Sequence, residues 1–285
     1  MHQTSPHTLS FRGYAAAALF AALFVQTATA AIAVKDGEKI AFLGDSITQG
    51  GWSNPAGYVK LVMAGLAANG VKAEAVPAGI SGHKSSDMLA RLEKDVISKK
   101  PQWMTLSCGV NDVWHGKRGV PLDDAAAASG AYDEKVAERG TYAKNIAQIV
   151  EKAQAAGIKV VLLTATVIQE NLDSPENAKL APFNEYLRTL AKEKKLPLAD
   201  LNAMFQAGIK AENKPGQKVL TGDGVHMNAA GNKLMATGVL EAFGLNAAEM
   251  TKARESWMAL EEEAKAASEA KAKAAAEAPA APAVK

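Results

Sequence analysis

The sequence predicts a three-layer, doubly wound α/β fold of the flavodoxin-like kind, with a parallel five-stranded sheet. Short apolar segments alternate with longer segments whose apolar residues recur at helical spacing, as in βαβ units. The segment 158–164 is almost entirely apolar, as expected for a central parallel strand buried on both faces. In such a sheet ligands bind beyond the carboxyl ends of the strands, so functional residues are expected there.

The expected strands and helices follow one another in alternation. The strands are expected at residues 39–43, 73–76, 103–107, 158–164 and 196–201. The helices are expected at residues 58–68, 86–99, 132–156, 176–194 and 228–243. Gly70, Pro101 and Gly157 follow the first three helices closely, and glycine or proline at such positions ends a helix.

Residues 1–30 have the pattern of a secretory signal peptide. They contain no acidic residue and one arginine, Arg12, followed by an apolar run over 14–25 and by Ala28-Thr29-Ala30. This pattern predicts cleavage after Ala30. A membrane anchor is the alternative, but the run is shorter than the roughly 20 residues that span a bilayer. We therefore expect a secreted or periplasmic protein, with no stable membrane insertion once the signal is removed.

The composition narrows the class of protein further. The 32 Lys and Arg nearly balance the 30 Asp and Glu, so no nucleic-acid partner is expected. The single cysteine, Cys108, excludes an intramolecular disulfide. One domain is expected over 31–248, followed over 249–285 by a tail rich in Ala, Glu and Lys. Few large apolar side chains predict a helix that gives way to disorder, with contact to the cell wall as the alternative.

Three segments that directly follow expected strands carry residues suited to catalysis. Gly44-Asp45-Ser46 follows the first strand, and its glycine permits a sharp turn that presents Ser46 at the strand's carboxyl end. Gly82 lies in the turn after the second strand, where a backbone N–H can approach a ligand. Asn111 follows the third strand, and its amide can donate to developing negative charge. Each segment alone also fits an ordinary turn, and for Asn111 alone a residue that caps a local turn is the favoured interpretation.

A fourth segment, residues 223–226, precedes the last helix of the domain. Asp223 lies three residues before His226, so the chain can fold back within one loop. Asp223 can then accept the imidazole Nδ1–H and leave Nε2 as a base. The only other histidines after residue 30, His83 and His115, do not lie in a comparable loop.

In this order and at these strand ends, the four segments resemble the SGNH hydrolases, also called the GDSL family. The first block matches Gly44-Asp45-Ser46, with Ile47 in place of the leucine of the family name. The second block falls on Gly82, the G-x-N-D block on 109–112 and the D-x-x-H block on 223–226. The resemblance covers residues 40–243, although Pro77 stands where the family commonly has an asparagine. The resemblance implies the SGNH-hydrolase fold.

The resemblance also implies a mechanism. His226 takes the proton from Ser46, which attacks an ester carbonyl, and Asp223 orients the imidazole. The Ser46 and Gly82 backbone N–H groups and the Asn111 side chain bind the oxyanion. Hydrolysis of the acyl-enzyme completes the cycle, with no metal and no organic cofactor.

The substrate is the least determined part of this prediction. The insert at 113–131 is expected beside the catalytic centre, and the candidate substrate-binding residues are Trp52, His83, Trp114 and His115. Exposed tryptophans can stack on sugar rings, which together with export favours removal of acetyl groups from carbohydrate or similar esters. Tryptophans that merely pack the loops are an equally good interpretation. A lysophospholipase or thioesterase acting on longer acyl chains is the alternative enzyme.

The sequence disfavours three other kinds of function. A non-catalytic, cell-wall-associated binding protein is disfavoured because the complete set of site residues has distinct catalytic roles. Cys108 as a nucleophile is disfavoured because it lies at the end of a predicted buried strand, whereas reactive thiols need an exposed electropositive setting. A metal site built on the histidines is disfavoured because no histidine spacing matches a zinc-ligand motif.

Overall fold

Five parallel strands form one sheet, in the order β2-β1-β3-β4-β5. This computed structural model describes residues 1–2, 31–212, 214 and 216–277; the predicted signal peptide therefore lies, apart from its first two residues, outside the described residues. The strands are β1 Lys39–Gly44, β2 Glu74–Gly79, β3 Trp103–Ser107, β4 Lys159–Leu163 and β5 Leu198–Ala199. The predicted fold class, a doubly wound α/β sheet of five parallel strands, is confirmed.

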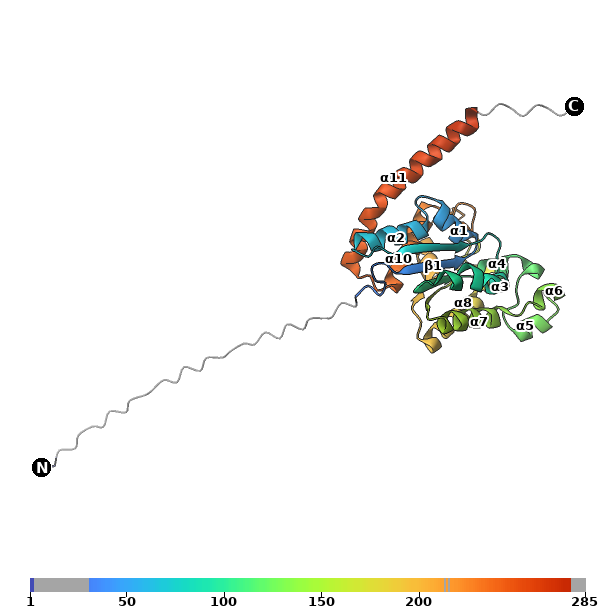
Figure 1. Ribbon diagram of the computed structural model, residues 1–285, viewed down its shortest axis with the longest axis horizontal. Coiled ribbons are helices and arrows are strands. Elements are labelled where there is room, and N and C mark those ends of the chain that lie inside the picture. The colour runs from blue at the N-terminus through green and yellow to red at the C-terminus, as the bar shows by residue number, and fades with distance from the viewer. Residues whose placement is uncertain (3–30, 213, 215, 278–285) are drawn as a thin grey trace.

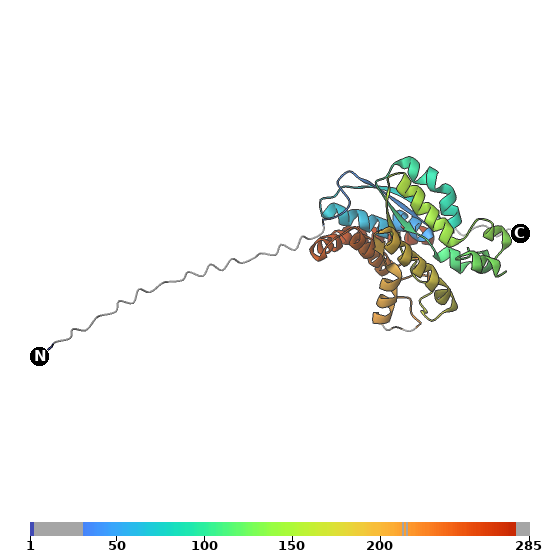
Figure 2. The same ribbon diagram turned by 90° about the horizontal axis from the view of Figure 1, so that it is seen from below.

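Helices cover both faces of the sheet (Figures 1 and 2). On one face α2 contacts α10 and α11, and on the other α7 contacts α3 and α8. The helices are α1 Ser46–Ser53, α2 Tyr58–Ala68, α3 Ser85–Asp95, α4 Val110–Trp114, α5 Asp124–Ala128, α6 Glu134–Ala137, α7 Tyr142–Ala155, α8 Pro175–Lys194, α9 Leu201–Glu212, α10 Ala229–Ala242 and α11 Ala247–Glu277, with short 3-10 turns η1 Ile97–Lys99 and η2 Gly116–Arg118.

The strand register brings the predicted functional turns to one edge of the sheet. Gly44, the last residue of β1, pairs with Gly79, the last residue of β2. In the same sheet Leu43 pairs with Leu106 of β3, which ends one residue later. Because the strands are parallel, the turns after β1, β2 and β3 leave the sheet side by side.

The long helix predicted at 132–156 is wrong in its first part. Residues 134–137 form the separate short helix α6, and α7 begins only at Tyr142. Gly140, which lies between the two helices, has a φ of +88°, a conformation that favours glycine and interrupts the helix. Thr141 then adopts an extended conformation at the start of α7.

Other differences concern the ends of elements. β2 runs to Gly79 and includes Pro77, which is tolerated because β2 is an edge strand. β5 is reduced to Leu198–Ala199 because the chain turns into α9 at Leu201. The pattern reading also missed α1 and α9, two helices that directly follow strands.

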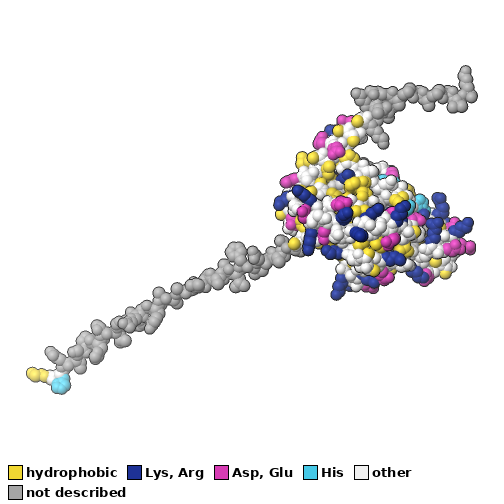
Figure 3. Space-filling model, viewed as in Figure 1, with side chains coloured by type: hydrophobic (Ala, Val, Ile, Leu, Met, Phe, Trp, Pro, Cys, Tyr) yellow, Lys and Arg dark blue, Asp and Glu magenta, His cyan; other side chains and the backbone are white. Residues whose placement is uncertain are grey.

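Helix α11 runs across the expected domain boundary at 248–249, which stays a prediction. Met250, Ala253 and Trp257 are buried, and the Trp257 indole N–H donates to the Leu61 carbonyl of α2 at 2.8 Å. Leu260 and Ala264 still pack against the core, and the later part of the helix projects away from the domain (Figure 1). No helix in the described part of the chain meets the length and hydropathy that crossing a bilayer requires. On the face drawn in Figure 3, basic and acidic side chains are intermixed.

We predict that Trp257→Ala lowers the free energy of unfolding by about 3–5 kcal/mol, because it empties a buried site and removes the bond to Leu61. The neighbouring Met258 is 66% exposed, so Met258→Ala is the matched control, with a change within about 0.5 kcal/mol. Urea unfolding followed by circular dichroism measures both. Equal, small losses in the two variants would show that α11 does not belong to the folded domain.

Candidate active site

The chain turns sharply from β1 into α1 and presents Ser46 as the first residue of the helix. Asp45 caps α1, its carboxyl accepting the Ile47 N–H at 2.9 Å. A Cβ on Gly44 would collide with the Thr48 side chain, so the turn requires glycine. The Ser46 N–H thus lies in the first turn of α1, where backbone N–H groups have no acceptor within the helix.

Ser46, His226 and Asp223 form a chain of hydrogen bonds. The Ser46 Oγ lies 2.9 Å from His226 Nε2, and His226 Nδ1 lies 2.6 Å from Asp223 Oδ2. An ionised carboxylate only accepts hydrogen bonds, so Nδ1 carries the imidazole proton and Nε2 is free to accept from the serine. This arrangement can deprotonate Ser46 as it attacks an electrophile.

Asp223 is held in its charged form. Burial acts to raise its pKa, but hydrogen bonds from the His226 side chain and from the His226 and Val225 N–H groups outweigh it and lower the pKa to about 2. The two backbone bonds measure 2.7 and 2.9 Å. The loop therefore folds around the Asp223 carboxylate, which stays ionised and accepts the hydrogen bond from the imidazole across the physiological pH range.

Asn111 and Gly82, the other predicted oxyanion residues, meet beside the nucleophile turn. The Asn111 Nδ2 donates to the His83 carbonyl at 3.1 Å and to Asp45 Oδ2 at 3.4 Å. Gly82 immediately precedes His83, is exposed and has a φ of +77°. The first three sequence blocks are therefore joined through one buried amide.

The candidate substrate-binding residues divide into two groups. His115 Nε2 lies 3.2 Å from Asn111 Oδ1, and the exposed ring of Trp114 lies 5.9 Å from the His115 ring. His83 adjoins the same amide through its carbonyl. Trp52 is placed differently: it lies near the other end of α1, half-buried, with the Lys60 ammonium 3.7 Å above its ring. Trp114 thus offers the more open aromatic face.

The surroundings of His83 and His115 favour the neutral form of both imidazoles. Burial lowers the pKa of His83, and the Arg91 guanidinium lowers it further. Arg91 donates to His83 Nδ1 at 3.0 Å, so the proton of this ring resides on Nε2. Burial, Lys84 and Arg118 lower the pKa of His115.

Arg91, which was not predicted from the sequence, holds the ends of β1 and β2 and the His83 ring together. It is buried and donates to the carbonyls of Gly44 and Ala78 at 2.8 and 2.9 Å, as well as to His83. Asp95, one helical turn away, pairs with it at 3.1 Å. The available signal was an arginine placed three residues after Met88 on the apolar face of a predicted helix.

Two buried carboxyl groups, Asp45 and Asp112, lie beneath the site. Burial and the neighbouring Asp112 raise the pKa of Asp45 to about 7, although the Ile47 N–H acts against this. Burial also raises the pKa of Asp112, which accepts from the N–H and hydroxyl of Ser85 at 3.0 and 2.6 Å. Asp112 thereby fixes the start of α3, a role that its place in the third block did not reveal.

The remaining candidate chemistry finds no support in the geometry. Burial and Asp112 raise the pKa of the Cys108 thiol, which disfavours a reactive thiolate. Within the described residues, no group of three His, Cys, Asp or Glu side chains is arranged to hold a metal ion.

Comparison with known proteins agrees with this fold. The GDSL-like lipase/acylhydrolase family model matches residues 42–234. An acetylxylan esterase of Geobacillus stearothermophilus is 28% identical over 225 residues, which cover 74% of this chain and 96% of the relative. The crystal structure of the acetyl xylan esterase AlAXEase is 33% identical, with a TM-score of 0.59 over 72% of this chain and 98% of that one. The chain therefore belongs to the GDSL-like lipase/acylhydrolase family and is a carboxylic ester hydrolase.

We predict that Asp45 makes the protein less stable as the pH rises from about 4 to about 7. Its folded pKa of about 7 exceeds the ordinary 3.8, so the native state holds a proton that the unfolded chain releases over this interval. Asp45→Asn, which mimics the neutral acid, removes that dependence. Its stability relative to the natural protein should rise across the interval by an amount on the order of 4 kcal/mol.

Urea unfolding at a series of pH values measures this difference. Asp173→Asn, at an exposed carboxylate, is the control and should run parallel to the natural protein. If Asp45→Asn also ran parallel, Asp45 would be ionised in the folded state and our account of the buried pair would be wrong.

Proposed function

We propose that this protein is an exported serine esterase that removes acetyl groups from carbohydrate or similar esters, with Ser46 as nucleophile. The observation that carries the proposal is the hydrogen-bonded chain from Ser46 through His226 to Asp223. Membership of an ester hydrolase family supports the reaction class. The acetyl specificity is supported by the two relatives that are acetylxylan esterases.

In the proposed mechanism, Ser46 Oγ attacks the ester carbonyl carbon as its proton passes to His226 Nε2. The resulting imidazolium is stabilised by Asp223, and its proton then goes to the departing alkoxide of the sugar hydroxyl. Water attacks the acetyl-serine in the same way, giving its proton to His226. The products are acetate, the free sugar hydroxyl and regenerated Ser46.

The negative charge on the carbonyl oxygen needs donors that are already in place. The Ser46 N–H at the start of α1, the Gly82 N–H and the Asn111 amide are the proposed donors. Asn111 is held by its contacts to His83 and His115, and its second N–H, which makes the long 3.4 Å bond to Asp45, is the one that turns to the oxyanion when charge develops. Removing one such donor typically costs about 3 kcal/mol of transition-state stabilisation.

A polymer needs a reaction centre that it can reach. The side chains of His226 and Asp223 are 44% and 56% exposed, so the site opens directly to the surface. Trp114 is also exposed and lies next to His115, where its ring can stack on a sugar. Both features favour a carbohydrate carrying a small acyl group over a long-chain lipid ester. Export is supported by the signal-like sequence at residues 1–30.

We predict that Ser46→Ala and His226→Ala each lower kcat on 4-nitrophenyl acetate by at least about 10⁴-fold, while circular dichroism shows an unchanged fold. Ser53→Ala, at the exposed end of the same helix, is the matched control and should retain activity. If Ser46→Ala hydrolysed this ester at the natural rate, the nucleophile assignment would be wrong.

We predict that Trp114→Ala raises KM for acetylated xylo-oligosaccharides about tenfold, the equivalent of one lost stacking contact of about 1.4 kcal/mol. KM for 4-nitrophenyl acetate should stay unchanged, because that ester has no sugar to stack. Trp52→Ala is the comparison, since Lys60 already covers that ring. Efficient cleavage of long-chain esters with no acetate released from any acetylated glycan would exclude a carbohydrate acetylesterase.

A further inference from the structure

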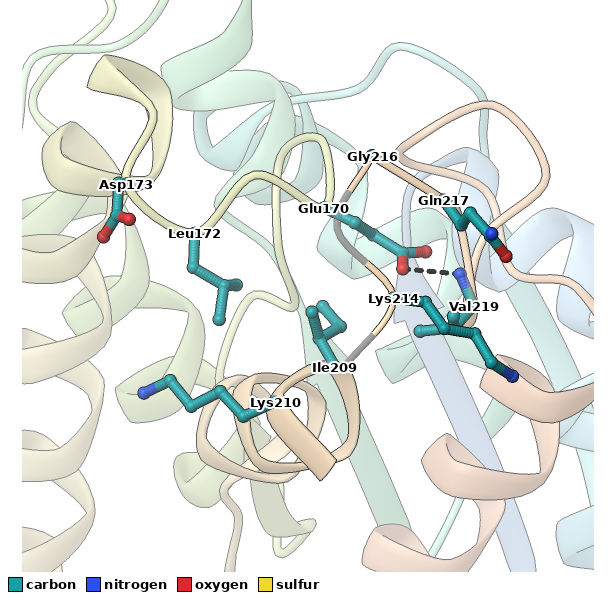
Figure 4. Close-up of a pocket in the computed structure, with 9 residues that line it drawn as sticks. All are labelled: Glu170, Leu172, Asp173, Ile209, Lys210, Lys214, Gly216, Gln217 and Val219. Atoms are coloured by element: carbon teal, nitrogen blue, oxygen red, sulfur yellow. Dashed lines mark hydrogen bonds between the residues drawn. The ribbon is translucent and has the colours of Figure 1, made fainter. Parts of the chain in front are cut away.

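Glu170 lies in the connection between β4 and α8, outside the four sequence blocks. Its carboxylate accepts four hydrogen bonds from three consecutive residues. The N–H groups of Val219, Leu220 and Thr221 donate at 2.7, 3.0 and 2.7 Å, and the Thr221 hydroxyl donates at 2.6 Å. Figure 4 shows the Glu170 side chain reaching across to the Val219 N–H. These three residues lead directly into the loop that carries Asp223 and His226.

We propose that Glu170 is the positioning residue that holds the Asp223–His226 loop in line with Ser46. This inference rests on the proposed function of that triad. Glu170 does not touch the reacting atoms; it acts through the backbone that carries them.

The loop transmits a displacement at one end to the other, because it is closed on itself. The Gly222 N–H donates to the His226 carbonyl at 2.8 Å, and the Asn228 N–H donates to the Leu220 carbonyl at 3.1 Å. Thr221 and Met227 face each other across this closure as an antiparallel bridge. A shift of Leu220 and Thr221 therefore shifts the backbone of His226 as well.

The same connection holds the tip of the loop. The Gln169 N–H donates to the Gly224 carbonyl at 2.8 Å, and Gln169 adopts a φ of +59°, which is rare for a residue with a side chain. The Thr221 hydroxyl accepts the Gly224 N–H at 3.1 Å while it donates to Glu170. Gln169 and Glu170 thus hold the loop on both sides of Asp223.

The segment 219–221 is packed against the core on one side and borders an open hollow on the other. A cavity of about 380 Å³ lies beside Glu170, lined by Leu172, Ile209 and Val219 among others (Figure 4). Leu220 and Thr221 are buried, whereas Val219, which lines this hollow, is only half-buried. A carboxylate that accepts four hydrogen bonds adds to that packing, since bonds to a charged acceptor are about twice as strong as neutral ones.

The test compares Glu170→Gln with the natural protein. Glutamine keeps the size but has one accepting oxygen, so it cannot serve all four donors. A misplacement of about 1 Å at a reacting group can cost 10²-fold in rate, so kcat on 4-nitrophenyl acetate should fall about 10- to 100-fold while KM stays within about twofold. Glu176→Gln, at an exposed residue in the first turn of α8, is the matched control and should leave kcat unchanged.

A second readout does not depend on activity. The 2.6 Å bond between His226 Nδ1 and Asp223 makes the shared proton strongly deshielded in ¹H NMR spectra. We expect this resonance to weaken or shift in Glu170→Gln and to persist in Glu176→Gln. A purely stabilising role would lower the unfolding midpoint without moving this signal or kcat below that midpoint.

The outcomes separate the two proposals. If the natural protein hydrolyses no ester, the proposed function fails and the resonance alone decides the role of Glu170. If the natural protein is active and Glu170→Gln matches it in both kcat and resonance, the positioning role is overturned. Should Glu170→Gln not fold, Thr221→Val removes one donor while keeping the carboxylate, and unchanged kcat and resonance in that variant would overturn the proposal equally.

Discussion

The hydrogen bond between Ser46 Oγ and His226 Nε2 is 2.9 Å long and joins residues that are 180 positions apart in the chain. No local motif can produce it. The sheet brings the end of β1 to the edge where Ser46 begins α1, and the loop after α9 carries His226 to the same edge. In the proposed mechanism the two side chains must meet within a fraction of an ångström for proton transfer, so the surrounding structure has to hold both partners still.

Two separate supports meet this requirement, one on each side of the bond. Beneath Ser46, Arg91 ties the ends of β1 and β2 together, and the buried Asp45 caps α1. On the other side, Glu170 holds the backbone that leads to Asp223. The two aspartates differ in charge because their surroundings differ. The buried Asp45 has a raised pKa, whereas Asp223, exposed and hydrogen-bonded, has a lowered one.

The sequence predicted the residues of the candidate site better than the residues that hold them in place. Runs of apolar residues predict the strands, and the glycine, serine, asparagine and histidine residues that lie near the strand ends form a recognisable pattern. Arg91 and Glu170 bond mainly to backbone carbonyl and N–H groups, which leave no trace in the partner's residue type, so the sequence did not reveal these contacts. For Arg91 the only signal was its place on the apolar face of a predicted helix. The helix predicted at 132–156 began too early because one glycine, Gly140, interrupts an otherwise helical pattern. Helix α11 packs on the domain through a few widely spaced side chains, Met250, Ala253 and Trp257, in a segment rich in Ala, Glu and Lys.

Labelling with an organophosphonate ester, followed by peptide mass spectrometry, tests the central claim that Ser46 is the activated nucleophile. The reagent reacts with a serine hydroxyl only when a neighbouring base takes its proton, so the adduct reports the Ser46–His226 pair directly. We expect one adduct, on the peptide that contains Ser46, and its loss in His226→Ala. An adduct on a different serine, or none in a preparation that hydrolyses esters, would contradict the account.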